Sequence, residues 1–148
     1  MRSWPQSPEM KPLHNSPPDG VHYLLEFFGC AKEQLDSLPF WKKLLSKAIA
    51  DSGITVLNKH FYKFSPHGIT GYLLLSASHI SIHTWPEYSY VTCDVFSCGD
   101  ENETKDIVKQ IKDNLTHKKT KTRKFKRGFR VCSYAKWDNR KRSLYFIR

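Results

Sequence analysis

With 148 residues, the chain is long enough for one domain with a real hydrophobic core and too short for two. Its 39% hydrophobic and 14% aromatic residues favour a folded globular protein, and no apolar run approaches the ~18 residues that a membrane-spanning helix needs. The net charge is +10, yet no helix-turn-helix, zinc-finger or RNP pattern accompanies it, so we expect neither a membrane nor a nucleic acid as partner.

The first twenty residues hold five of the eight prolines and no apolar segment like that of a secretory signal. This composition predicts a flexible tail over residues 1–20 and a single domain over residues 21–148. Without an export signal, we expect reduced thiols and a cytoplasmic location. None of the cysteines forms a CxxC pair, which argues against a metal site; they are Cys30, Cys93, Cys98 and Cys132.

The first half of the domain predicts strands and helices in turn. Residues 21–28, VHYLLEFF, are dense in β-forming residues and end at Gly29, so they predict a strand. The other elements expected here are a short helix at 32–38, a helix from Pro39 to about Asp51, a strand at 54–64, a turn at 66–71 and a strand at 72–76. The longer helix would bury Phe40, Leu44, Leu45 and Ala48.

The stretch from Ser76 to Gly99 combines two predicted strands, at 79–85 and 88–96, with unusually many reactive side chains. Core strands are built from Val, Ile and Phe and rarely collect serines, histidines and cysteines. Because side chains alternate along a strand, one face is predicted to be core and the other a functional site. The core face would carry Ile80 and Ile82, and the site face His79, Ser81, His83 and Trp85.

The last third of the chain is basic, with 16 Lys and Arg against 5 Asp and Glu in residues 101–148. Asn102 or Thr104 could cap a helix over residues 103–115. The run HKKTKTRKFKRGFR at 117–130 predicts a basic strand at 121–134 that bends near Gly128. The final apolar patch, at 144–147, suggests an edge strand. A basic block can bind an anionic partner, but a solvated strand is the simpler interpretation.

The order of these elements favours an α+β fold. Strands outnumber helices, and consecutive strands are joined by short turns, which is typical of antiparallel pairing. We therefore expect a two-layer α/β sandwich, with a mainly antiparallel sheet covered on one face by helices.

Two neighbouring motifs carry a family resemblance: SHISIHTWPE at Ser78–Glu87 and FSCGD at Phe96–Asp100. With their flanks, they resemble the bacterial and archaeal type of S-adenosylmethionine decarboxylase, a pyruvoyl-dependent enzyme of spermidine synthesis. The resemblance covers about residues 20–131. The supporting stretches are LLEFFGC at 24–30, ITVL at 54–57, KFSPHGITG at 63–71 and KRG at 126–128.

The resemblance implies a proenzyme that cuts itself between Ala77 and Ser78. By this analogy, the Ser78 hydroxyl attacks the Ala77 carbonyl to form an ester, and His83 then removes the Ser78 α-proton. Thr70 matches a family hydroxyl that supports processing. The expected products are a β chain of residues 1–77 and an α chain of residues 78–148 that begins with a pyruvoyl group.

The resemblance also implies how the mature enzyme acts on S-adenosylmethionine. The pyruvoyl carbonyl forms a Schiff base with the substrate amine and takes up electrons as carbon dioxide leaves. Cys98 matches the cysteine that returns a proton to carbon, whereas Cys93 has the opposite strand parity and is expected to be structural. Two positions match substrate-binding residues of the family, Phe64 for adenine and Glu87 for the ribose hydroxyls. Trp85 is expected to lie beside the site and to contribute to substrate binding.

By the same resemblance, two processed copies form a homodimer with sites near the interface. The chain departs from the family at Ala77, where many members have Glu; because the attack uses the backbone carbonyl, cleavage remains expected. Two alternatives stay open. One is a decarboxylase of the same fold that acts on ornithine or arginine, against which the adenine and ribose residues argue. The other is an unprocessed binding or regulatory protein with a basic C-terminal half. The presence of Ser78, His83 and Cys98 together argues against it, because a binding protein has no need of these reactive residues at this spacing.

Overall fold

The computed structural model describes residues 19–50, 52–128, 135–138 and 143–146, the last two ranges by their backbone alone. The described chain divides into a main unit, Gly20–Arg127, and a second unit that includes a short β hairpin. The elements are β1 (Asp19–Phe28), α1 (Lys32–Leu35), α2 (Leu38–Ala50), β2 (Val56–Lys63), β3 (Ile69–Leu75), β4 (Ser78–Trp85), the 3-10 helix η1 (Pro86–Tyr88), β5 (Tyr90–Ser97), α3 (Glu101–Asn114), β6 (Lys119–Gly128), β7 (Ala135–Asp138) and β8 (Ser143–Phe146).

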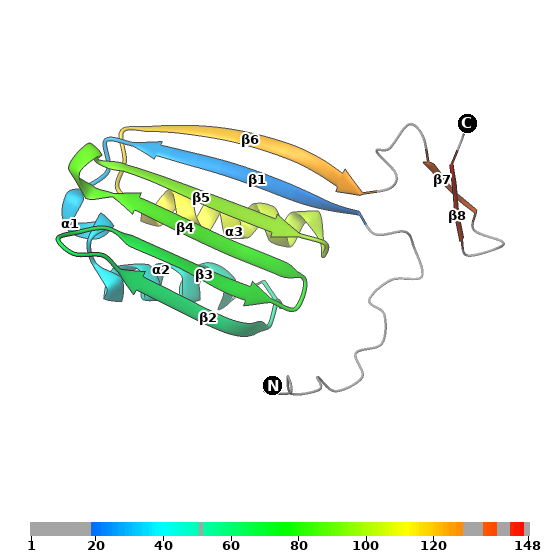
Figure 1. Cartoon of the computed structure of the whole chain (residues 1–148), viewed down its shortest axis with the longest axis horizontal. Helices are drawn as coiled ribbons and strands as arrows, with labels where there is room; N and C mark the ends of the chain where they lie inside the picture. Colours follow the sequence, from blue (N-terminus) through cyan, green and yellow to red (C-terminus); the bar gives the residue numbers. More distant parts are fainter. Residues whose placement is uncertain (1–18, 51, 129–134, 139–142, 147–148) are drawn as a thin grey trace. The chain divides into compact units, whose positions relative to one another are not determined.

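The main unit is a six-stranded sheet in the order β2-β3-β4-β5-β1-β6. The pairs β2–β3, β3–β4, β4–β5 and β1–β5 are all antiparallel. Helices α2 and α3 lie on one face of this sheet, and no helix of the described residues covers the other, helix-free face (Figure 1). The predicted two-layer α/β sandwich is therefore confirmed.

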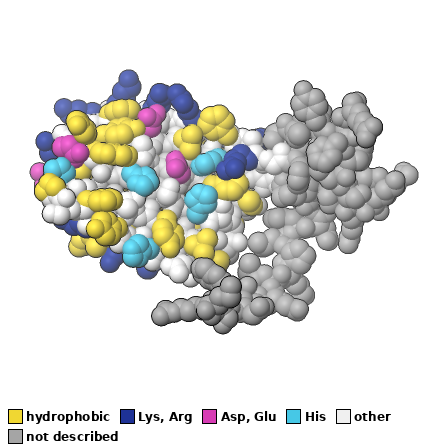
Figure 2. All heavy atoms as spheres, in the orientation of Figure 1, with side chains coloured by type: hydrophobic (Ala, Val, Ile, Leu, Met, Phe, Trp, Pro, Cys, Tyr) yellow, Lys and Arg dark blue, Asp and Glu magenta, His cyan; other side chains and the backbone are white. Residues whose placement is uncertain are grey.

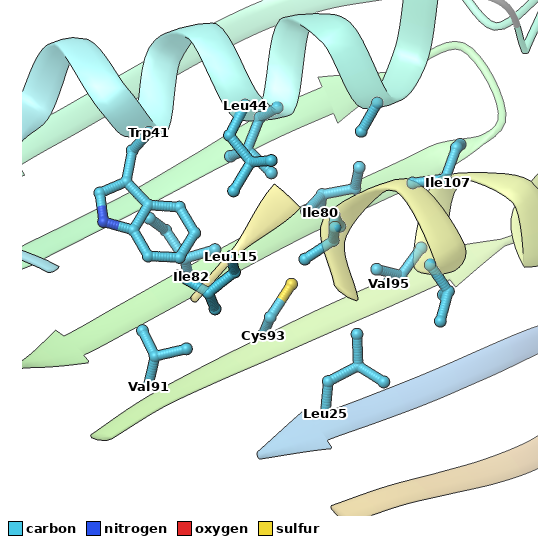
Figure 3. Close-up of a cluster of buried hydrophobic side chains, with 14 of the residues drawn as sticks. Leu25, Trp41, Leu44, Ile80, Ile82, Val91, Cys93, Val95, Ile107 and Leu115 are labelled. Carbon is cyan, nitrogen blue, oxygen red and sulfur yellow. The ribbon is translucent and has the colours of Figure 1, made fainter. Parts of the chain in front are cut away.

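The core lies between the sheet and the two long helices (Figure 3). Ile80 and Ile82 of β4 are fully buried, and so is Trp41 of α2. On β5 the buried positions alternate with partly buried ones, as expected for a sheet with one covered face. The predicted core face of β4, with Ile80 and Ile82, is confirmed, and the function of the opposite face stays a prediction.

Three sequence predictions differ from the structure in detail. The turn expected at 66–71 is shorter, because β3 begins at Ile69 and includes Thr70. The buried face of α2 includes Trp41, and Phe40 is only partly buried beside it. Helix α3 is capped by Asp100, whose carboxylate accepts hydrogen bonds from the backbone N–H groups of Asn102 and Glu103. Asn102 and Thr104 therefore lie inside the helix and were wrongly predicted as caps.

The basic strand predicted at 121–134 corresponds to β6, which ends at Gly128; residues 129–134, with Cys132, lie outside the described residues. The predicted tail at 1–20 is likewise described only from Asp19 onward. Strand β8 covers most of the patch at 144–147 but pairs with β7 in a separate two-stranded sheet. The single domain expected over residues 21–148 stays a prediction. Among the residues that the structure describes, no helix has the length and apolar character to cross a membrane.

Candidate functional site

The predicted cleavage bond lies at the exit of the tight hairpin turn between β3 and β4. Leu75 and Ser78 pair across this turn, and Ser78 also pairs with Ser97 on β5. Ser78 has a φ of 147°, a backbone conformation that residues other than glycine rarely adopt. Such strain persists only where surrounding structure holds it, and it concentrates at functional sites. The backbone is thus strained at the residue that the sequence marks as reactive.

The Ala77 carbonyl is polarised by a neighbouring backbone group. The Cys98 N–H donates a hydrogen bond of 2.9 Å to the Ala77 oxygen. The turn after β5 is held close by, because a Cβ on Gly99 would stand 3.4 Å from the Ala77 Cβ. A donor in this position stabilises negative charge that develops on the carbonyl oxygen during attack by a hydroxyl.

The two cysteines of the β5 region have opposite environments. Cys98 is exposed, just beyond the strand and on the parity of the helix-free face. Cys93 is 1% exposed and points into the core (Figure 3), where burial raises its thiol pKa well above the usual range. The burial of Cys93 agrees with its predicted structural role, and of these two cysteines Cys98 is the one exposed to solvent.

Thr70 and His83 form a pair on the helix-free face of the sheet. They are opposite each other on β3 and β4, and Thr70 Oγ1 lies 2.7 Å from His83 Nδ1. Thr70 also donates to the Ile82 carbonyl at 3.3 Å. Because the Thr70 hydroxyl uses its proton for the Ile82 carbonyl, it accepts a hydrogen bond from the Nδ1–H of His83. In this tautomer of the neutral ring, Nε2 carries no proton and can accept one. This arrangement suits His83 to act as a general base.

A cavity of about 330 Å³ opens beside this pair. Its volume lies within the range of ~300–1,000 Å³ that is typical of small-molecule sites. The His83 and Trp85 rings that line it have centroids 6.1 Å apart. The predicted site residues at this cavity are Phe64, His83, Trp85 and Glu87.

His67 also lines this cavity and was missed by the sequence analysis. Its Nε2 lies 3.0 Å from Oε2 of Glu87, so it holds one oxygen of the predicted ribose-binding carboxylate. The turn depends on Gly68, whose φ is +103° and whose missing Cβ would meet the Thr84 carbonyl at 3.2 Å. The glycine in the HG pair was the available signal, because it marks a turn that returns the chain toward η1.

The predicted site residues therefore fall into two groups at opposite ends of β4. Ala77, Ser78 and Cys98 lie together at the start of the strand. The second group lies near the end of the strand and consists of Phe64, Thr70, His83, Trp85 and Glu87. Five residues of extended strand span about 16 Å. Within one copy of the chain, Ser78 and His83 are not in contact.

The helix-free face of the sheet carries exposed apolar side chains. Figure 2 shows hydrophobic and histidine side chains gathered over this face. Several large apolar side chains are more than a third exposed there, which is unusual for a surface exposed to water. They are Phe28, Tyr72, Leu74 and Trp85.

Comparisons with known proteins identify the family of this chain. Residues 21–128 match the family model described as S-adenosylmethionine decarboxylase. A protein of Methanococcus maripaludis named S-adenosylmethionine decarboxylase proenzyme is 43% identical over 109 residues, which are 74% of this chain and 89% of that protein. A Clostridium botulinum protein of the same name is 38% identical over 74% of this chain and 94% of its own length.

A solved structure has the same fold. The crystal structure of the adenosylmethionine decarboxylase from Aquifex aeolicus superposes with a TM-score of 0.72 at 35% sequence identity, covering 76% of this chain and 93% of that one. The comparisons give no support to the ornithine or arginine decarboxylase, or to the unprocessed binding protein, that the sequence left open. The resemblance read from the two motifs is confirmed, and the chain belongs to the S-adenosylmethionine decarboxylase family.

Proposed function

We propose that the chain is a self-processing, pyruvoyl-dependent S-adenosylmethionine decarboxylase that is cut between Ala77 and Ser78. One observation carries this proposal beyond family membership: the strained Ser78 follows a carbonyl that accepts a hydrogen bond from Cys98 N–H. A hydroxyl and a polarised carbonyl at one peptide bond are what an N-to-O acyl shift needs. The residues at this bond therefore fit the formation of a pyruvoyl group from Ser78.

Processing begins when Ser78 Oγ bonds to the Ala77 carbonyl carbon. The charge that develops on the carbonyl oxygen is stabilised by the Cys98 N–H, and the amide becomes an ester. His83 then removes the Ser78 α-proton, which eliminates the ester and frees the carboxyl end of residue 77. The remaining dehydroalanine takes up water and loses ammonia. Because only the backbone of Ala77 takes part, its methyl side chain does not prevent cleavage.

In the mature enzyme, the pyruvoyl group supplies an electron sink for decarboxylation. The Cys98 thiol, which lies at the same end of the sheet, returns a proton to the substrate carbon. The cavity near the end of β4 provides flat aromatic faces at Phe64 and Trp85 for an adenine ring and a sulfonium. The Glu87 carboxylate, held through one oxygen by His67, can accept hydrogen bonds from ribose hydroxyls.

These roles require two copies of the chain. A proton moves directly only between atoms about 3 Å apart, whereas His83 is separated from Ser78 by about 16 Å of strand. In a two-fold symmetric dimer, the same surface of both copies forms the interface. If the two β4 strands run in opposite directions there, the start of β4 in one copy lies beside the end of β4 in the other. The apolar helix-free face supports this pairing. We therefore propose a homodimer in which Ser78 and Cys98 of one copy face the cavity residues of the other.

The test begins with the intact mass of the purified protein. We expect two fragments, residues 1–77 and residues 78–148 with a blocked pyruvoyl end that hydrazine labels. The Ser78→Ala variant should keep the uncut mass of 17.3 kDa. The processed protein should release carbon dioxide from S-adenosylmethionine, and not from ornithine or arginine. A folded wild-type chain that stays whole and takes up no hydrazine would contradict the proposal, and release from ornithine or arginine would contradict the substrate.

A further inference from the structure

His79 directly follows the cleavage serine and has no role in the steps described above. Its Nδ1 lies 3.3 Å from Ser78 Oγ, within reach of the hydroxyl proton. His79 pairs with Leu74 on β3 and Phe96 on β5, and its side chain lies on the helix-free face. It is therefore the imidazole that contacts the attacking oxygen within the same copy of the chain.

Neighbouring aromatic rings hold the His79 ring in place. Its centroid lies 5.8 Å from that of Phe96 and 6.4 Å from that of His22, which stands edge-on to it. Phe96 is itself covered by the Arg127 guanidinium, 4.6 Å above the ring. These contacts restrict the ring, so its nitrogen stays directed at Ser78.

The neighbouring imidazole, His22, is uncharged, which matters for proton transfer to His79. His22 Nδ1 lies 3.4 Å from Arg127 Nη1, and because a guanidinium only donates, that nitrogen of His22 must accept. Burial, with the Arg127 charge and His79 adding to it, lowers the pKa of His22, against a smaller opposing effect of Asp94. When His79 takes up a proton, the neighbouring His22 ring therefore carries no positive charge that would repel it.

We propose that His79 is the catalytic base and acid of the first processing step. As Ser78 Oγ bonds to the Ala77 carbonyl carbon, His79 Nδ1 takes the hydroxyl proton, and the carbonyl electron pair moves to its oxygen. When the carbonyl re-forms, the C–N bond breaks and His79 gives the same proton to the Ser78 nitrogen. The products are an ester and an amine, with no atom gained or lost. This inference rests on the proposed function and leaves the α-proton to His83, so each step uses its own histidine.

The test compares three histidine variants by what they accumulate. Neutral hydroxylamine cleaves an ester at residue 77 and leaves the amide intact, so intact mass distinguishes the two. His79→Gln keeps a polar side chain but cannot carry a proton; we expect uncut, hydroxylamine-resistant precursor, with processing slowed at least ~100-fold. His83→Ala should accumulate the hydroxylamine-sensitive ester. His60→Gln, at an exposed position of β2, is the matched control and should process like the wild type.

A second variant separates proton transfer from folding. In His79→Ala, added imidazole should restore part of the cleavage, which a purely structural role of the side chain would not allow; circular dichroism and thermal unfolding report the fold. Cleavage of His79→Gln at the wild-type rate, accumulation of the ester in it, or failure of imidazole to speed His79→Ala in its folded state would overturn the inference. None of these results would affect the proposed function, which is tested separately by the cleavage and the substrate of the wild-type chain.

Discussion

At the scale of single residues, Cys98 contributes two separate groups to the proposed site. Its backbone N–H donates to the Ala77 oxygen at 2.9 Å, and its side chain is exposed at the same end of the sheet. In the proposed mechanism, the backbone group serves the cleavage of the chain, and the thiol serves the reaction of the mature enzyme. A substitution of the side chain removes the second group and keeps the first, so the two reactions can be separated by experiment.

We expect Cys98→Ala to cleave itself at close to the wild-type rate and to lose decarboxylation by at least ~100-fold, the usual worth of a positioned acid. Intact mass measures the first effect, and carbon dioxide release from S-adenosylmethionine the second. Cys93→Ala is the control; it removes a buried sulfur, so it should lower the thermal stability and leave the activity of the folded enzyme unchanged. A fully active Cys98→Ala enzyme would remove the thiol from the mechanism.

Most of the cavity residues could be predicted from the sequence motifs. Phe64, His83, Trp85 and Glu87 were predicted by motif, and they line one cavity. His67 was not predicted, because its position depends on a turn at a positive-φ glycine that brings it to Glu87 across a gap in the sequence. The separation of Ser78 from His83 was also not predicted. Strand parity predicts which face of the sheet a side chain occupies. It does not show that Ser78 and His83, five residues apart on β4, are too distant to touch within one copy of the chain.

At the scale of elements, the segment after β5 links the proposed site to the start of α3. Cys98 contacts Ala77, and two residues later the Asp100 carboxylate accepts from two of the first free N–H groups of the helix. The polar run DENET at 100–104 offered two predicted cap candidates, Asn102 and Thr104, and the spacing of residues alone did not point to Asp100. Asp100 is the cap because the chain is still extended there, with ψ of 132°, when its side chain reaches back to the helix.

Replacing Asp100 by alanine should lower the free energy of unfolding by about 1 kcal/mol, the usual cost of losing an N-terminal cap. Asp100→Asn keeps an oxygen acceptor and should remain within a few tenths of that of the wild type. Urea unfolding of the uncleavable Ser78→Ala chain, followed by circular dichroism, measures both without the complication of processing. Equal stability of Asp100→Ala and the parent chain would show that the helix end finds another acceptor.

At the scale of the whole molecule, the alternation of apolar residues predicted the sheet and its two covering helices. Side chains alternate on β4 and β5 because one face packs against α2 and α3, and this periodicity is visible in the sequence. The pairing of β8 with β7 was not predicted, because an apolar patch specifies a strand but not its neighbour. The proposed role of the helix-free face as a dimer contact is likewise not visible in the periodicity, because that face carries polar as well as apolar residues.

The proposed division of each site between two copies makes a specific prediction for mixed dimers. Ser78→Ala lacks the attacking hydroxyl, and His83→Ala lacks the base for the α-proton, so neither should process alone. In a mixed dimer, one site combines the intact Ser78 of the second variant with the intact His83 of the first. We therefore expect co-expression to restore cleavage of the His83→Ala chain, identified by a mass tag in the intact-mass spectrum. Co-expression with a Ser78→Ala/His83→Ala double variant should restore nothing. If mixed dimers form and the His83→Ala chain stays uncut in both cases, each copy builds its own site and the shared arrangement is wrong.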